Sequence, residues 1–598
     1  MTDPATPRVS LRLVTGPGGM GKTRSALEAL KRAGQQGWPA LWLAAELPQD
    51  WSAAWQDWLA KAGDTPALLV LDYVEGRQDI LLRLLDAALQ TMATVVATDA
   101  GGPRLRLLLL ARNGAWWPEL HRHKECSADV AALLTGPGNA GLEELPPWSR
   151  GTQVRESAYR SAMQGYAAAQ GLIPPADPYQ PDLADPLYER PLHLHMAAIA
   201  TLAGERPEHP AALLDSQLRR EWRYWTRAHA APATDYDDWA DALAWLALVQ
   251  GASRAQAAAT LAGLGMADAD LPTSLARTYP AADSGIGPLQ PDQLAETLIR
   301  ERLAARRGAA LLHAALPEDP DMAERAIQVI ARLAARGNSE TGDTRWRTTL
   351  VAGLTQAWPR HGQRLVAAAH ASDPGLGRLV NEAWEQLAPT TQEAIAPQLN
   401  MPDYSTPLLD LGVAVTRVLL RLAATPAVRA GALNNLANRL AEQGDFAARA
   451  EALDCAQEAV ALHRDLAQAQ PAAYRPDLAM SLNKLANRLA EQGDAAPRSE
   501  ALGCVRDAVA IRRDLAQAQP AVYLPDLAGS VHNLAKLLAD QGDATARSEG
   551  LVCARAAVAI RRDLAKAQPA AYQADLAGSL NGLAIYLAKL SDATAHAE

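Results

Sequence analysis

The chain has 598 residues, of which 49% are hydrophobic and 21% are charged. This length is too great for one hydrophobic core and predicts about three to five domains, and the composition excludes a disordered chain. The formal net charge of -10 disfavours a general nucleic-acid-binding role, since phosphate attracts basic surfaces. The sequence shows neither an apolar run of about 18 residues nor a signal-peptide pattern, so we expect a cytoplasmic protein without a membrane partner.

The stretch from Gly16 to Thr23 carries the clearest chemistry in the sequence. It fits the phosphate-binding pattern G-x-x-x-x-G-K-[ST] at every constrained position. Its glycines let main-chain N–H groups curl around an anion, its lysine supplies a positive charge, and its threonine supplies a hydroxyl for Mg²⁺. The expected nucleotide-binding residues are Gly16, Gly18, Gly19, Met20, Gly21, Lys22 and Thr23.

The segments on either side of this loop support the same interpretation. Residues 9–14 are an apolar run that predicts a strand, and residues 23–33 predict a helix with one apolar face. The loop would then lie at a helix N-terminus, where the helix dipole and the unpaired N–H groups favour phosphate. We expect ATP or ADP with Mg²⁺ as the ligand, because the sequence contains no guanine-reading N-K-x-D motif.

Further short apolar runs predict the rest of an α/β sheet. Strands are expected over 40–45, 68–72, 105–110 and 142–145. The third strand ends in Asp72, a carboxylate placed to hold Mg²⁺ together with Thr23. In the class of P-loop proteins with strand order 5-1-4-3-2, the fourth strand is central, and Arg112 at its end would face the γ-phosphate. The alternative for Arg112 is an ordinary surface arginine at a strand end.

Three segments together resemble the STAND class of signal-transduction NTPases, which are relatives of AAA+ proteins. They are 16–23, 68–75 (LLVLDYVE) and 107–112 (LLLLAR). The resemblance implies that Glu75 is the carboxylate that activates the attacking water. NACHT-type members often carry a second acidic residue where this chain has Gly76. The resemblance therefore implies slow ATP hydrolysis.

The resemblance extends beyond the predicted sheet. Residues 155–169 resemble a helix of the family's lid, and Pro191 matches a proline that packs near the adenine. The order of helices and a glycine-containing turn between 215 and 296 resembles the family's winged helix. Many members place a histidine there against the β-phosphate, and this sequence offers no such histidine. The residue that would latch the closed state is thus unassigned by the sequence.

The C-terminal region is an internal repeat with a period of 49 residues. The hexapeptide at 433–438 returns at 482–487, at 531–536 and, in weaker form, at 580–585. Each unit predicts one helix such as 478–492, a Gly-Asp turn, a second helix such as 500–517, and a proline-containing connection. The pattern resembles tetratricopeptide repeats, whose usual unit is about 34 residues. Three cysteines obey the period, which indicates small core residues: Cys455, Cys504 and Cys553.

Together these patterns predict five parts. They are an α/β P-loop NTPase core over 1–146, an all-α lid over 147–205, a winged-helix-like domain over 206–308, a helical arm over 309–425, and an α-solenoid of tetratricopeptide-type repeats over 426–598. Such solenoids present a surface for a partner. Two interpretations of the side chains at Asn435, Asn438 and Arg439 stay open, namely ligand contacts and a solvated helix face.

Two functions fit these parts. The first is an ATP-binding signalling switch that hydrolyses ATP slowly and couples its nucleotide state to a protein or peptide ligand on the repeats. Nucleotide-dependent self-assembly and a separate effector protein would complete this switch, since the first predicted strand begins close to the start of the sequence. The alternative is a protein-binding repeat scaffold with a structural and nearly inactive ATP site.

Overall fold

The chain divides into two compact units, Met1–Gln386 and Leu387–Glu598. The computed structural model of the protein describes residues 8–16, 19–43, 51, 55, 58, 65–72, 74, 78–96, 104–111, 114, 116–123, 126–136, 139–145, 151–207, 212–228, 235–266, 268–281, 285–335, 344–372, 374–402, 405–492, 495–539, 541 and 544–595. Of the helices in this part of the chain, none is both long enough and apolar enough to cross a membrane.

A five-stranded parallel sheet forms the start of the first unit. Its strands are β1 (Val9–Thr15), β2 (Ala40–Leu43), β3 (Pro66–Leu71), β4 (Arg104–Leu110) and β5 (Asn139–Glu144). The order across the sheet is β2-β3-β4-β1-β5, which confirms the predicted order 5-1-4-3-2. The fourth strand is therefore central, with β1 on one side and β3 on the other.

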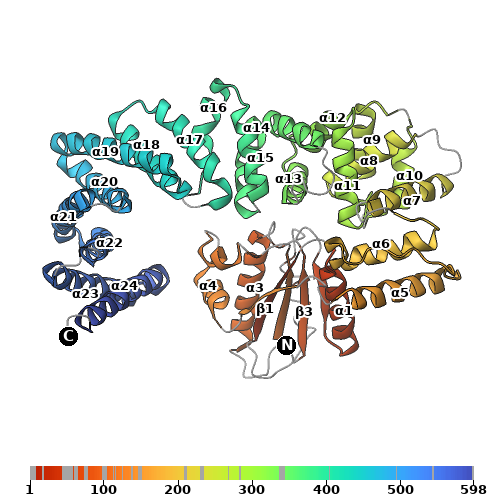
Figure 1. Ribbon diagram of the computed structural model, residues 1–598, viewed down its shortest axis with the longest axis horizontal. Helices are drawn as coiled ribbons and strands as arrows, with labels where there is room; N and C mark the ends of the chain where they lie inside the picture. Colours follow the sequence, from red (N-terminus) through yellow and green to blue (C-terminus); the bar gives the residue numbers. More distant parts are fainter. Residues whose placement is uncertain are drawn as a thin grey trace. The chain divides into compact units, whose positions relative to one another are not determined.

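Helices cover both faces of this sheet (Figure 1). On one face α1 (Lys22–Gln35) buries Ala26 and Ala33 against Leu68 and Val70 of β3. On the other face α3 (Gln78–Val96) and α4 (Ala128–Thr135) pack over the alternate side chains of β1, β3 and β4. Because both faces are covered, β3 (PALLVL) and the second half of β4 (LLLL) read as continuous apolar runs in the sequence.

Two paired helices follow the sheet, α5 (Gly151–Gln170) and α6 (Pro191–Leu202). The buried Arg155 of α5 fixes the segment that leads into α6. Its guanidinium donates to the carbonyl of Leu183 at 2.7 Å and forms an ion pair with Glu189 at 3.0 Å. This segment ends in the 3-10 helix η3 (Pro186–Glu189), so the start of α6 is held by charge-assisted hydrogen bonds.

The middle of the first unit is helical, with only isolated β-bridges among its described residues. Its helices are α7 (Ala212–Ala228), α8 (Tyr236–Leu248), α9 (Arg254–Gly263), α10 (Leu271–Thr278) and α11 (Asp292–Ala304). Ile286 bridges antiparallel to Ala252, which lies between α8 and α9, and to Pro280, which follows α10. This helix order agrees with the helices expected between 215 and 296.

The predicted helical arm falls on both sides of the boundary between the two units. In the first unit it comprises α12 (Gly308–Ala315), α13 (Pro320–Ala335), α14 (Arg345–Ala371) and α15 (Pro374–Glu385). In the second unit it comprises α16 (Pro389–Ile395) and α17 (Leu409–Leu422). The buried faces of these helices are mainly apolar, which explains why the sequence showed no site there.

The second unit continues as a helical repeat in which each helix packs against the next (Figure 1). The helices are α18 (Pro426–Gln443), α19 (Phe446–Ala469), α20 (Pro471–Glu491), α21 (Ala495–Ala518), α22 (Pro520–Ala539), α23 (Ala544–Ala567) and α24 (Pro569–Ala595). The units exceed the usual length because the helices themselves are long, with 24 residues in each of α19, α21 and α23.

The sequence predicted that the proline of each repeat unit lies in a connection between helices. This prediction is wrong. Pro471, Pro520 and Pro569 are each the first residue of a helix. Proline suits this position because its fixed φ is helical and its missing N–H has no helical partner there. Consecutive units are therefore joined by almost no linker, with Gln470 alone between α19 and α20.

The core of the repeat contains the cysteines, which confirms their prediction as core residues. Cys455 is buried, and Cys504 and Cys553 pack partly buried against the same apolar cluster. The candidate ligand contacts on the repeat differ in exposure, and both interpretations of them stay open. Asn435 is exposed, whereas Arg439 is half-buried and donates to the carbonyl of Pro402 at 3.0 Å.

A ladder of buried polar side chains joins successive repeat units. Asn434 Nδ2 donates to Ser481 Oγ at 2.6 Å, and Asn483 Nδ2 donates to Ser530 Oγ at 2.7 Å, one unit further along. Second helices also contact these serines, since Arg512 Nη1 donates to Ser530 Oγ at 2.6 Å. Because an unmatched buried polar group is costly, this ladder favours one register between neighbouring units.

Candidate functional site

The phosphate-binding loop lies between the end of β1 and the start of α1. Gly19 and Gly21 have φ of 81° and 89°, a region that residues with a Cβ rarely adopt. Gly21 is also the N-cap of α1, and its carbonyl accepts from the N–H of Ser25 at 2.8 Å. These glycines turn the chain directly into the helix, whose N-terminal N–H groups and dipole favour an anion.

The two polar side chains that follow the loop have defined partners. The Lys22 ammonium donates to the carbonyl of Gly16, across the loop. Thr23 Oγ1 donates to Asp72 Oδ2 at 3.2 Å. Asp72 directly follows β3, so the strand order brings this carboxylate to the first turn of α1. A hydroxyl and a carboxylate at this spacing are the oxygen ligands that suit Mg²⁺.

Three predicted site residues lie outside the described residues, namely Gly18, Glu75 and Arg112. The residue before Arg112 is described, and it marks where the fourth strand ends. The N–H of Ala111 donates to the carbonyl of Val14 at 3.0 Å, so the carboxyl end of β4 lies beside the end of β1. The roles expected for Glu75 and Arg112 stay predictions.

The first turn of α6 contacts the loop. Pro191 is the first residue of α6, and the N–H of the next residue, Leu192, donates to the carbonyl of Gly19 at 3.3 Å. This hydrogen bond uses one of the N–H groups that a helix start leaves without a helical partner. The structure thus brings the segment around Pro191 to the phosphate-binding loop, and its expected contact with adenine stays a prediction.

A residue that the sequence analysis missed also reaches the loop. Gln293, in the first turn of α11, is 2% exposed. A Cβ placed on Gly19 would lie 2.8 Å from Gln293 Nε2 and 3.2 Å from Leu192 Cβ. α6 and α11 therefore both pack on the main chain of Gly19. No sequence signal marked Gln293, since a glutamine at a helix start ordinarily faces solvent.

The helices beside the loop also place a polar pair near α1. Tyr166 Oη of α5 lies 3.1 Å from His195 Nδ1 of α6. Desolvation lowers the pKa of His195, and the positive charge of Arg24, next to Thr23, lowers it further. Desolvation also raises the pKa of Tyr166. Near neutral pH both side chains are therefore uncharged, while the nearby Arg24 carries a positive charge.

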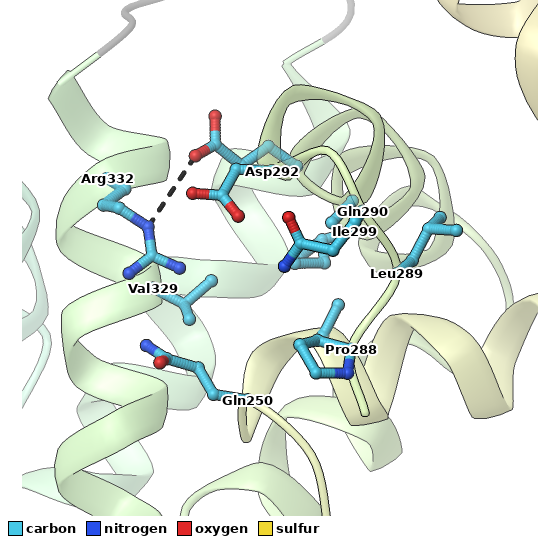
Figure 2. Close-up of a pocket in the computed structure, with 11 residues that line it drawn as sticks. Gln250, Pro288, Leu289, Gln290, Asp292, Ile299, Val329 and Arg332 are labelled. Carbon is cyan, nitrogen blue, oxygen red and sulfur yellow. Dashed lines mark ion pairs between the residues drawn. The ribbon is translucent and has the colours of Figure 1, made fainter. Parts of the chain in front are cut away.

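A separate cavity of about 80 Å³ lies between α8, α11 and α13 (Figure 2). Its polar lining includes Gln250, Asp292 and the ion pair of Arg332 with Glu296, at 3.8 Å. A cavity of this size holds several waters, since one water needs roughly 10–15 Å³. None of the loop residues that the structure describes lines this cavity.

Comparison of the chain with protein-family models and with curated proteins gave no match. The residues around Gly19, Lys22, Thr23 and Asp72 are thus the basis for a functional proposal.

Proposed function

We propose that the protein is an ATP-binding signalling switch of the STAND type. It binds Mg·ATP at the loop from Gly16 to Thr23, hydrolyses it slowly, and couples its nucleotide state to a partner on the C-terminal repeats. The observation that carries this proposal is the pairing of Thr23 with Asp72 at 3.2 Å, beside a glycine-rich loop at the start of α1. That combination supplies N–H groups for phosphate and oxygens for its metal.

Thr23 and Asp72 are the residues that would hold Mg²⁺. A bound Mg²⁺ would supply positive charge to the phosphates and fix their orientation. Lys22 is placed to add a second positive charge, because its ammonium reaches across the loop to Gly16. A phosphate held in the loop would offer that ammonium a stronger acceptor than a carbonyl, since hydrogen bonds between charged groups are stronger.

Removing the carboxylate tests the metal role. We expect Asp72→Asn to weaken ATP binding about tenfold in the presence of Mg²⁺ and to change it little in the presence of a chelator. Titration calorimetry with and without Mg²⁺ measures both. The control is Asp129→Asn, an exposed carboxylate in α4. An Asp72→Asn protein with an unchanged response to Mg²⁺ would contradict the assignment.

Turnover is expected to be slow, with Glu75 as the carboxylate that activates water and Arg112 as the contact to the γ-phosphate. Glu75→Gln should lower the rate of phosphate release and spare ATP affinity, because it alters the attacking water and not the phosphate contacts. An unchanged rate would exclude Glu75 as the base.

The switch itself requires two inputs. A ligand shifts a two-state equilibrium only by its differential affinity, and reversing a 99:1 preference takes about 5.5 kcal/mol. We therefore expect ADP to favour a closed monomer, and ATP together with the partner to favour a form that self-associates. Light scattering with ADP, with ATP, and with ATP plus a co-purified partner tests this. One mass under all three conditions would contradict the switch.

The second candidate function is a protein-binding scaffold with a nearly inactive ATP site. It is favoured by the helical repeat, whose helices α18 to α23 share one continuous apolar core with α17. Phosphate release measured with and without the co-purified partner separates the two candidates. Stimulated turnover supports the switch, and equally negligible turnover supports the scaffold.

A further inference from the structure

We propose that Gln293 is a positioning residue that links the conformation of the phosphate-binding loop to α11. The inference rests on the proposed nucleotide site and adds a route by which phosphate in that site affects a distant helix. Gln293 acts on the main chain at Gly19, and not on the phosphates. Nucleotide binding and the position of α11 are then coupled, each favouring the other.

Two residues, Leu192 of α6 and Gln293 of α11, pack against the main chain of Gly19. The N–H of Leu192 donates to the Gly19 carbonyl, and the amide nitrogen of Gln293 lies 2.8 Å from the position where a Cβ would stand. Gly19 also has a positive φ, which the turn into α1 uses. A change in its backbone conformation would therefore alter both this turn and the contacts with Leu192 and Gln293. Any rearrangement of the loop around a phosphate must therefore keep or displace Gln293.

α11 passes such a change on because ion pairs fasten it to α8. Arg302 near its C-terminal end bonds to Asp241 at 2.6 Å and to Asp237 at 2.8 Å. The Asp241 side chain is 1% exposed, and separating a buried ion pair would leave an uncompensated charge. α8 and α11 should therefore move together.

The contacts of α11 with α13 are polar in part. Arg300 Nη2 donates to the carbonyl of Leu333 at 3.2 Å, and Glu296 pairs with Arg332. The cavity of about 80 Å³ adjoins this same face of α11 (Figure 2). A helix beside a cavity lacks packing partners over part of its surface, so a small displacement there costs less than in a close-packed core.

Coupling between nucleotide binding and α11 should act in both directions and should affect ATP and ADP equally. Because Gln293 holds the loop and does not touch the phosphates, its removal should weaken ATP and ADP alike, by about three- to tenfold. In return, nucleotide should slow amide exchange in α11 of the wild-type protein. That slowing should shrink in Gln293→Ala, which a merely local loss of stability would not produce.

The first experiment measures ATP and ADP affinity in the 598-residue chain by calorimetry and follows α11 by hydrogen exchange. Gln293→Ala is compared with Gln170→Ala, an exposed glutamine at the end of α5. Equal weakening of both nucleotides, with loss of the protection in α11, supports the inference. Unchanged affinities overturn it. A change for ATP alone also overturns it, because that pattern requires direct contact with the terminal phosphate.

The second experiment uses the steric contact without any nucleotide. Gly19→Ala should displace Gln293 and speed amide exchange in α11. Gly37→Ala is the matched control, because Gly37 has a φ of 76° and open space where a Cβ would stand. In a Gln293→Ala background, Gly19→Ala should alter exchange in α11 much less. Equal exchange in the wild-type and Gly19→Ala proteins would overturn the contact.

The two proposals fail in different ways. A wild-type protein that binds no nucleotide removes the proposed function, while the exchange experiment still decides whether the loop and α11 are linked. A wild-type protein that binds nucleotide, with Gln293→Ala indistinguishable from it, removes the link and leaves the nucleotide site in place.

Discussion

The phosphate-binding loop of the first unit and the repeat of the second unit are assembled in different ways. At the loop, Gly19 is contacted by Leu192 and Gln293, and Thr23 by Asp72, from three distant parts of the chain. In the repeat, the Asn–Ser contacts recur, each joining one unit to the next. The contacts at the loop thus occur once and depend on how distant segments fold together, whereas the contacts in the repeat occur at equivalent positions of successive units.

This difference predicts how each region responds to amino-acid substitutions. A solenoid's stability is approximately a sum over units and their interfaces, so a lost contact weakens one part of the array. A site that several segments build once has no second copy, so one substitution can abolish its function and leave the fold intact. Substitutions in the two regions should therefore have separable effects on stability and on nucleotide affinity.

The largest effect should come from the core of the repeat. Leu482 is 2% exposed, and Leu482→Ala should lower the unfolding free energy of the second unit by about 2–5 kcal/mol, through lost burial and a cavity. Hydrogen exchange measured for each helix separately reports this loss of unfolding free energy. ATP affinity should change by less than about twofold. Leu422→Ala, at an exposed leucine of the same unit, is the control. A large loss of ATP affinity would show that the two regions are not separable.

The converse substitution is Lys22→Ala at the loop. We expect Mg·ATP affinity to fall at least tenfold, about 1.4 kcal/mol, because the charge that reaches over the loop is gone. Calorimetry provides the affinity, and amide exchange in α18 to α24 should match that of the wild type. Lys31→Ala, at an exposed lysine of the same helix, should bind normally. Equal affinity in Lys22→Ala and wild type would remove the nucleotide site.

A smaller effect should follow from breaking one rung of the polar ladder. Ser530→Ala removes the oxygen that accepts from both Asn483 and Arg512, which should cost about 1 kcal/mol and speed exchange locally in α20 to α22. The control is Ser499→Ala at an exposed serine. If exchange changes equally in all repeat helices, the ladder does not act unit by unit.

The smallest effect concerns the cysteines of the repeat. Desolvation, together with nearby carboxylates, raises the pKa of Cys455 to about 11, so the native thiol should react slowly with iodoacetamide at pH 8. A thiol whose folded pKa is raised contributes stability below its unfolded pKa, about 8.5, and loses it as pH rises toward 11. Labelling should therefore accelerate on unfolding. Rapid labelling of the native Cys455 at pH 8 would contradict its burial.

The sequence by itself determined the features that depend on local patterns. Short apolar runs separated by helical segments predicted the five strands. The aspartate that follows the third strand, Asp72, was predicted to lie close to Thr23, and the two are hydrogen-bonded. The spacing from Gly16 to Lys22 predicted a loop at a helix start, since glycine readily adopts the positive φ values seen at Gly19 and Gly21. The period of 49 residues predicted the repeat, because equivalent positions recur in one environment.

Only the tertiary structure decided which helices meet the loop and how the repeat units are joined. Gln293 reaches Gly19 because the chain between them folds back through α5 to α10, a path that no local pattern encodes. The pairing of Asn483 with Ser530 and Arg512 likewise depends on the register of long helices. The identity of a polar side chain does not say whether it faces water or a partner, since its burial depends on residues far away in the sequence.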